Sequence, residues 1–353
     1  MSQLTESATW REIHAQPEIW RSWSAQLAEQ AAQVRSWIGA RSPDEIWLSG
    51  AGTSAFIGDI LCAGDRRLRA VATTDLVAGP QDLLNDDHIL AVQFGRSGNS
   101  SESVGMMDVM DASRPSWDRL HITCNPDGAL ATRPAPGPGE ARVINLPEAT
   151  HDAGFAMTSS FTTMLLSALA CLSNFDAATQ LPKMADQADS LLEKIAALNI
   201  PRPDRAVFLG SGALTGVARE SALKVLELAA GRTVTQWDSC LGFRHGPKAL
   251  VDKTTHVFVM LHPDAHTAQY DQDMADEIRR QYPDIHVTTI GTRGDIEITS
   301  TGDVRADAVL YVLPAQILSA QWSADLELPV DDPFQGQNLS RVVSGVTLYP
   351  FAG

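Results

Sequence analysis

The chain is poor in cysteine, in basic residues and in long apolar runs. Its 353 residues include four cysteines that lie far apart with no Cys-x-x-Cys spacing: Cys62, Cys124, Cys171 and Cys240. This arrangement argues against a disulfide scaffold or a zinc site. No apolar run approaches the ~20 residues that span a bilayer, and the N-terminus lacks a charged-then-apolar signal. We therefore expect a cytoplasmic protein with no metal, no cofactor and no membrane partner.

The charge balance is strongly acidic. The sequence has 43 acidic and 27 basic residues, which gives a formal net charge of -16. Such a surface disfavours nucleic acid and anionic membranes as partners. A phosphorylated small molecule remains compatible, because local amides and a few cations are enough to hold it. The hydrophobic fraction of 44% describes a globular protein with a full core, long enough for two domains.

Apolar strand candidates alternate with helical stretches in two series. The first series follows a polar, tryptophan-dotted helical lead-in, and the second follows a linker near 199–204. Alternation of this kind predicts doubly wound parallel sheets, and its restart indicates an internal duplication. We expect a helical segment at 1–43 and α/β domains at 44–200 and 201–353. The strand candidates are 45–49, 71–74, 88–94, 120–124 and 142–146, then 205–209, 256–261, 286–290 and 309–313.

A serine-rich turn follows the strand candidate 88–94. It runs from Gly95 to Ser103 and includes two glycines and four serines. Glycines let the backbone curl so that amides converge, and the following helix N-terminus adds partial positive charge. An ordinary helix cap explains one serine of the run and leaves the others without a purpose. The turn therefore predicts a site for a phosphate monoester.

An earlier turn, Gly50–Ala55, allows a second interpretation. It fits the G-x-G-x-x-A fingerprint of dinucleotide binding, and Asp75 lies at the spacing of a ribose contact. A nicotinamide or flavin enzyme is thus an alternative. Thr53 and Ser54 disfavour it, because they add hydroxyls that a pyrophosphate turn does not need.

One helical run combines carboxylates with a lysine. Glu220, Lys224 and Glu227 are spaced i, i+4 and i+7, so they share one face of a helix. His245 follows in a loop punctuated by glycine and proline. A carboxylate and a histidine brought together can move protons on carbon and oxygen, which is the chemistry of sugar isomerisation. A solvated helix laced by Glu–Lys pairs, with a chance histidine nearby, is the alternative.

These motifs together resemble the sugar isomerase (SIS) superfamily from about residue 45 to the C-terminus. Gly50–Ser54 looks like its first phosphosugar turn, and Gly95–Ser100 looks like its S-x-S-G-x-T phosphate loop with departures at both ends. The run from Glu220 to Glu227, with His245–Pro247, is similar to the isomerase half of glucosamine-6-phosphate synthase. The resemblance implies two tandem flavodoxin-like SIS domains behind an N-terminal helical segment.

Within the superfamily, segments 155–161, 332–334 and 338–343 look most like the AgaS branch. That branch is described as D-galactosamine-6-phosphate deaminase/isomerase, and also as tagatose-6-phosphate ketose/aldose isomerase. We expect no glutaminase domain before the tandem, and Ser2 stands where an N-terminal-nucleophile glutaminase requires cysteine. We therefore expect the amino-sugar reaction to run towards ammonia release.

The resemblance also implies roles for single residues. It makes Glu227 the base, with Glu220 as the alternative, and His245 the ring-opening group, contributed by the neighbouring subunit of a dimer. Arg341 falls where the synthase has a Schiff-base lysine; arginine stays protonated and cannot form that bond, but it can stabilise an enol-like oxygen. Met157 stands where the synthase has a serine. The implied substrate and phosphate contacts are Gly52, Thr53, Ser54, Arg96, Ser97, Gly98, Asn99, Ser100, Met157 and Lys224.

Other functions and assemblies stay open at this point. A plain aldose–ketose isomerase would use Glu227 and His245 on a hydroxyl substrate, and the sequence separates it poorly from a deaminase. A non-enzymatic sugar-phosphate-binding regulator is disfavoured, because the chain is acidic and shows no helix-turn-helix segment. Preference between galacto and gluco sugars is not predicted. We expect a homodimer, with a tetramer as the alternative.

Overall fold

The computed structural model describes residues 2–337 and 339–351, which form two compact α/β units. Unit 1 contains the chain up to Glu18, then Ala153–Thr158 and Pro182–Leu339. Unit 2 contains Ile19–Asp152, Ser159–Leu181 and the C-terminal segment from Ser340. Within the described ranges, no helix is both long and apolar enough to cross a bilayer.

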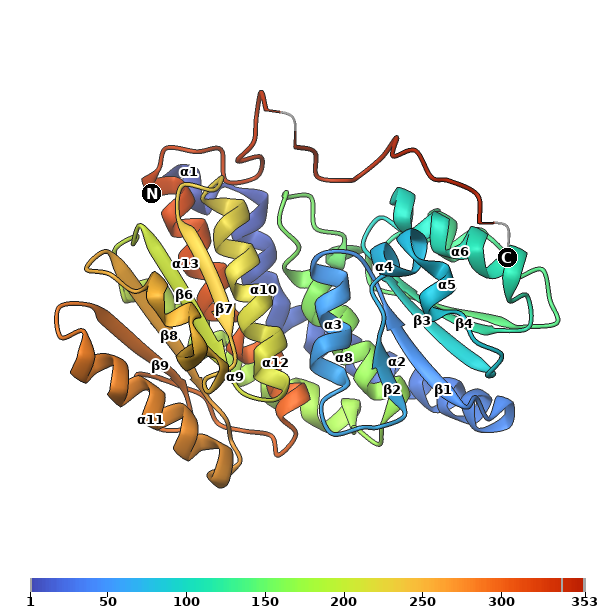
Figure 1. The fold of residues 1–353 in the computed structure, drawn as a ribbon, viewed down its shortest axis with the longest axis horizontal. Helices are drawn as coiled ribbons and strands as arrows, with labels where there is room; N and C mark the ends of the chain where they lie inside the picture. The colour runs from blue at the N-terminus through green and yellow to red at the C-terminus, as the bar shows by residue number, and fades with distance from the viewer. Residues whose placement is uncertain (1, 338, 352–353) are drawn as a thin grey trace. The chain divides into compact units, whose positions relative to one another are not determined.

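Unit 2 contains a five-stranded sheet in which every pairing is parallel. Its strands are β1 (Glu45–Ser49), β2 (Leu68–Ala70), β3 (Ile89–Gly95), β4 (Asp118–Thr123) and β5 (Ala141–Asn145). They are arranged in the order β2-β1-β3-β4-β5 (Figure 1). Parallel strands of this order need helical crossovers on both faces, which is why β3 and β4 are buried along their whole length.

The helices of unit 2 pack on both faces of this sheet. They are α3 (Thr53–Leu61), α4 (Thr73–Ala78), α5 (Pro80–Leu83), α6 (Ser101–Ser113), α7 (Ala129–Thr132) and α8 (Ser159–Leu172), with the 3-10 turn η1 (Glu148–Thr150). Trp47 and Ala91 lie on the face that packs against Met106 and Met110 of α6. Side chains alternate along a strand, so Leu48 faces the other way, towards α3. Helix α8 is buried along its whole length.

Unit 1 repeats the same topology. Its strands are β6 (Arg205–Gly210), β7 (Val234–Asp238), β8 (Thr255–Leu261), β9 (His286–Gly291) and β10 (Ile296–Glu297). All pairings are parallel, in the order β7-β6-β8-β9-β10, so β6 and β8 take the places of β1 and β3 (Figure 1). The internal duplication and the α/β fold class predicted from the sequence are therefore confirmed.

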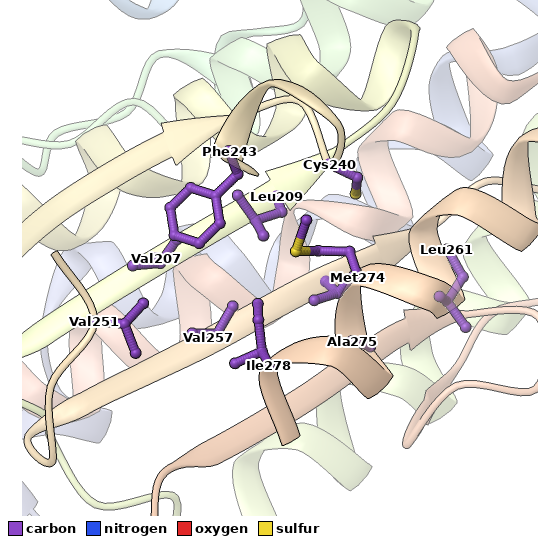
Figure 2. Packing of buried hydrophobic residues seen from close by; sticks show 11 residues of the cluster. Val207, Leu209, Cys240, Phe243, Val251, Val257, Leu261, Met274, Ala275 and Ile278 are labelled. Carbon is purple, nitrogen blue, oxygen red and sulfur yellow. The ribbon is translucent and has the colours of Figure 1, made fainter. Parts of the chain in front are cut away.

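The core of unit 1 has two apolar layers. Its helices are α9 (Ala177–Ala197), α10 (Ala213–Leu228), α11 (Ala265–Gln281), α12 (Val304–Tyr311) and α13 (Leu313–Asp325), with the 3-10 turns η2 (Gly242–His245) and η3 (Pro247–Leu250). Figure 2 shows the layer between the sheet and α11, where Leu209 and Val257 meet Met274 and Ile278. On the opposite face, Phe258 stacks on Phe208 and approaches Trp322 of α13.

The N-terminal lead-in is helical, as predicted. It consists of α1 (Ser2–Thr5) and the 34-residue α2 (Ala8–Arg41). Two tryptophans of α2, Trp20 and Trp23, are almost completely buried, whereas Trp10 and Trp37 are partly buried.

Two strand predictions are wrong. Residues 309–313 belong to α12 and α13, which are buried on nearly all sides, so their apolar run shows no helical periodicity. Residues 71–74 lead into α4, and the strand lies earlier, at Leu68–Ala70. The edge strands β7 and β10 were not predicted, because half-exposed β7 and two-residue β10 lack an apolar run.

Candidate active site

The first glycine turn of unit 2 connects β1 to α3. Gly52 adopts φ 56°, a backbone conformation that favours glycine, and α3 starts at the next residue. A side chain at Gly50 would come within 2.5 Å of the Ser54 backbone, so the turn has no room for one. Thr53 and Ser54 are buried at the N-terminus of α3. The turn therefore holds two hydroxyls where helix amides converge.

The serine-rich turn, here called the phosphate loop (Arg96–Ser100), connects β3 to α6. Its carbonyls are held by the segment after β4: the Asn125 amide donates to the Ser97 carbonyl at 2.9 Å, and the Leu130 N–H donates to the Gly98 carbonyl at 3.1 Å. Gly98 has φ 65° and packs against Thr123. Anchoring the carbonyls on one side fixes the curl that the sequence predicted.

Three phosphate-loop side chains also shape the loop itself. Ser97 Oγ accepts the Asn99 N–H at 3.3 Å, and Asn99 Oδ1 accepts the Ala129 N–H at 2.8 Å. Ser100 is the N-cap of α6: its hydroxyl accepts the Ser103 N–H and donates to Ser103 Oγ at 2.8 Å. Phosphate contacts from these residues stay a prediction. The Asn99 side chain already helps to hold the loop through its hydrogen bond with the Ala129 N–H.

Asn125 is a site residue that sequence reasoning missed. It follows β4 in the run Asn125-Pro126-Asp127-Gly128, where a side chain on Gly128 would lie 2.6 Å from the Ser97 carbonyl. Asn, Pro, Asp and Gly together are a strong turn signal. This signal predicts a turn. The contact of Asn125 with the phosphate loop depends on the pairing of β3 with β4, which the local signal does not predict.

A cationic cluster lies beside the phosphate loop. Arg96 is 6% exposed, and its guanidinium donates to the main-chain carbonyl of Arg341 at 3.3 Å. The pKa of His151 lies below its usual value, because neighbouring groups remove part of its hydration and because Arg341 and Arg96 are near it. His151 was not predicted as a site residue. Asn338, part of the motif that pointed to Arg341, lies outside the described residues.

The segment after His151 is held by a buried carboxylate. Asp152 is fully buried and caps α8: its two oxygens accept the N–H and hydroxyl of Ser159, at 3.1 and 2.5 Å, and those of Ser160, at 3.0 and 2.5 Å. This explains the two serines of the motif, Ser159 and Ser160. Met157, in the same segment but grouped with unit 1, is partly buried.

Replacing Asp152 with alanine should destabilise the protein by about 3 kcal/mol, because two hydroxyls and two amides lose a charged acceptor. Asp152→Asn should cost less, since one oxygen remains to accept. Urea or thermal unfolding of both variants measures this order. A change within about 0.5 kcal/mol for Asp152→Ala, the range of an ordinary surface substitution, would contradict the capping role.

In unit 1, the predicted carboxylate face lies on α10 and is not solvated. Lys224 is fully buried, with Nζ 3.4 Å from Glu220 Oε1 and 2.6 Å from Glu227 Oε2. Glu220 is also fully buried, whereas the Glu227 side chain is 20% exposed. Of the two candidate bases, Glu227 is therefore the one whose side chain is partly exposed to solvent. The solvated-helix interpretation of this run is wrong.

His245 ends the 3-10 turn η2 of unit 1 and is exposed. Phe243 anchors the turn in the apolar layer of Figure 2. Arg244 and Lys248 both bind Glu277 of α11, at 2.8 and 2.5 Å. The loop is therefore fixed on both sides of the histidine, and His245 projects from a rigid support.

The glycine turn of unit 1 repeats that of unit 2 without a phosphate loop beside it. Gly212 has φ 60° and ψ -128°, close to the 56° and -131° of Gly52. After β8, however, Asp264 caps α11 by accepting the His266 and Thr267 N–H groups. Ser211 donates to fully buried Asp271. In unit 1, the N–H groups at the start of α11 and the turn hydroxyl of Ser211 therefore donate to carboxylates of the chain itself. The phosphate loop is a feature of unit 2.

Comparison with known proteins decides the family. No family model matches the chain. D-galactosamine-6-phosphate deaminase AgaS of Shewanella sp. (strain ANA-3) is 38% identical over 372 residues, covering 99% of this chain and 94% of that protein. The chain belongs to the AgaS family. The resemblance to AgaS that the sequence motifs carried is confirmed.

Other relatives agree with the AgaS assignment. The crystal structure of tagatose-6-phosphate ketose/aldose isomerase from Escherichia coli has a TM-score of 0.87 and 34% identity, covering 99% of this chain and 98% of that one. More distantly, a glutamine–fructose-6-phosphate aminotransferase from Pyrobaculum aerophilum is 27% identical over 95% of this chain but 57% of that protein. The chain therefore aligns with a little over half of this longer aminotransferase.

Proposed function

We propose that this protein converts D-galactosamine 6-phosphate to tagatose 6-phosphate and ammonia. The observation that carries the proposal is the pairing of buried Lys224 with Glu227, a carboxylate with one edge in solvent, in a chain 38% identical to a deaminase AgaS along almost its whole length. A carboxylate held in this way is suited to shuttle a proton between neighbouring carbons.

The substrate phosphate is assigned to the phosphate loop. The loop is curled at Gly98, anchored through Asn125 and placed at the N-terminus of the 13-residue α6, whose first amides carry partial positive charge. Arg96 adds a nearly buried guanidinium. Thr53 and Ser54, at the N-terminus of α3, supply further hydroxyls to the same ligand, and Gly52 allows close approach of the backbone.

The chemistry follows from ordinary acid–base steps. His245 transfers a proton at the ring oxygen and opens the sugar; an imidazole can both accept and donate a proton, which suits this role. Glu227 removes the proton from C2 and returns one to C1 through an enolamine, while Arg341 stabilises negative charge on the enol-like oxygen. That oxygen takes up a proton, and the amine nitrogen gives one up as the C2 imine forms. Water adds to the resulting C2 imine, and ammonia leaves as the ketone forms. One water is consumed and no oxidant is needed.

We also propose a homodimer in which His245 serves the neighbouring subunit. The support is a group of exposed apolar side chains on β7, on the neighbouring α10 and in the segment between β7 and His245: Leu226 of α10, Val234 and Trp237 of β7, and Leu241. Strand β7 is an edge of its sheet and lies along α10 (Figure 1). Apolar groups gathered on a sheet edge favour burial against a second copy.

The test is ammonia release from galactosamine 6-phosphate and glucosamine 6-phosphate, beside ketose formation from galactose 6-phosphate. We expect ammonia from the galacto amino sugar. Ketose from galactose 6-phosphate without ammonia from either amino sugar would make the protein a plain isomerase, like the ketose/aldose isomerase of Escherichia coli that shares its fold. Tight sugar-phosphate binding with no turnover would point to a regulator.

A further inference from the structure

Three polar side chains form a buried row across the sheet of unit 2, directly before the phosphate loop. Strand register pairs Ser49 of β1 with Gln93 of β3, and Gln93 with His121 of β4. Paired residues of neighbouring strands point to the same face, so the three side chains lie side by side. Each is at most 1% exposed. The row lies on the face covered by α6, because Gln93 Nε2 donates to the Ser103 carbonyl of that helix at 3.3 Å.

The row contains polar atoms that no protein group satisfies. Among the described residues, Ser49 Oγ, Gln93 Oε1 and both ring nitrogens of His121 lack a hydrogen-bond partner. Burial, with Arg119 nearby, lowers the pKa of His121 to about 3, so the ring is neutral and offers one donor and one acceptor. Buried polar groups are almost always bonded to protein or to ordered water. Four such atoms in one row indicate water as the common partner.

The row is connected to both ends of the phosphate loop. Gln93 lies two residues before Gly95, at the end of β3 where the loop begins. Its side-chain amide reaches the carbonyl of Ser103, and the hydroxyl of Ser103 accepts from Ser100, the last loop residue, at 2.8 Å. A shift of Gln93 would therefore be transmitted to Ser100 through two hydrogen bonds.

Unit 1 shows that the fold itself does not require a polar row. The same register places Leu209, Val259 and Thr289 in the corresponding positions. Leu209 and Val259 are fully buried in the apolar layer of Figure 2, and the Thr289 hydroxyl donates to Asp295 at 2.8 Å. Unit 1 also lacks a serine-rich loop after β8. The polar row thus occurs in the unit that has the phosphate loop.

We infer that Ser49, Gln93 and His121 hold buried water beneath the phosphate loop and act as positioning residues for it. Burying these groups costs stability relative to the apolar row of unit 1. Their role in the folded protein is to hold the loop amides where a phosphate oxygen is received. The identity of the ligand rests on the proposed function; the positioning of the loop does not.

The test replaces two of the three row residues, Gln93 and His121, with their counterparts in unit 1. In the full chain, Gln93→Val combined with His121→Thr should leave the melting temperature unchanged or higher. Hydrogen exchange of the loop amides without ligand should speed up about tenfold, and the Kd for inorganic phosphate should rise about tenfold, which is about 1.4 kcal/mol. The single variant His121→Asn, which keeps a donor and an acceptor, should stay close to the native protein in both loop hydrogen exchange and the Kd for phosphate. Val259→Thr in unit 1 is the matched control and should change neither.

Unchanged loop exchange and unchanged phosphate affinity would overturn the inference, as would a lower melting temperature with no loop effect. Should the double variant fail to fold, a high-resolution crystal structure of the unmodified chain decides, because a dry row contradicts water-mediated positioning. The proposed function fails separately: a protein that shows the loop effects but releases no ammonia keeps the inference and loses the deaminase activity.

Discussion

Glu227→Gln lowers kcat for ammonia release by about 10²–10⁴-fold, the usual contribution of a positioned general base. The amide is nearly isosteric and can still accept a hydrogen bond from Lys224, which lies 2.6 Å from Glu227 in the native protein. It cannot take a proton from C2. Steady-state kinetics with galactosamine 6-phosphate should show the loss in kcat with KM near its native value. The melting temperature should fall, because buried Lys224 loses one anionic partner.

Glu220→Gln is the matched control for this result. Glu220 contacts the same lysine, but its side chain is fully buried. Removing its charge leaves buried Lys224 with one anionic partner fewer, so the expected loss is in stability rather than in turnover. An E227Q protein with ordinary turnover, or an E220Q protein that loses turnover at unchanged melting temperature, would move the role of base away from Glu227.

His245→Ala should reduce kcat by about 10²–10⁴-fold on the cyclic amino sugar and far less on a substrate that cannot close a ring. The reason is that ring opening is the step assigned to His245, and its loop is fixed through Glu277 on either side, so the truncation leaves the support intact. An amino-sugar 6-phosphate without hydroxyls at C4 and C5 serves as the open-chain substrate.

The comparison needs a histidine that lies outside the proposed chemistry. His266, exposed in the first turn of α11, is suitable, and His266→Ala should retain native turnover on both substrates. Equal losses for His245→Ala on the cyclic and the open-chain substrates would contradict ring opening and leave His245 with a later role.

Features that depend on local sequence were predictable. The spacing of Glu220, Lys224 and Glu227 fixes one helix face, and Gly98 of the phosphate loop allows the backbone to curl with a positive φ. The tandem fold could be read in the same way, because each restart of the strand–turn–helix pattern is a local signal. The boundaries 1–43, 44–200 and 201–353 stay a prediction; the two compact units of the structure each combine separate stretches of the chain.

Features that depend on packing were not predictable. An i, i+4 Glu–Lys pair has the same sequence on a wet surface and in a core, so the full burial of Lys224 could not be foreseen. Asn125 and Asp152 act through backbone groups brought to them by the sheet and by α8, and no local rule links them to their partners. The strand prediction for residues 309–313 failed for a related reason, since a helix buried on nearly all sides shows no helical periodicity in its apolar residues.

The C-terminal segment is attached to the phosphate loop through its main chain. Arg96 donates to the carbonyl of Arg341, and the Ser101 N–H donates to the carbonyl of Val343. A peptide carbonyl is the same whichever side chain its residue carries, so these two bonds place no demand on the identity of residue 341. As far as these two bonds go, a lysine at position 341 would be carried by the same backbone path as the arginine. Under the proposed function, a change between these two residues would exchange electrostatic for covalent chemistry without breaking either bond to the phosphate loop and α6.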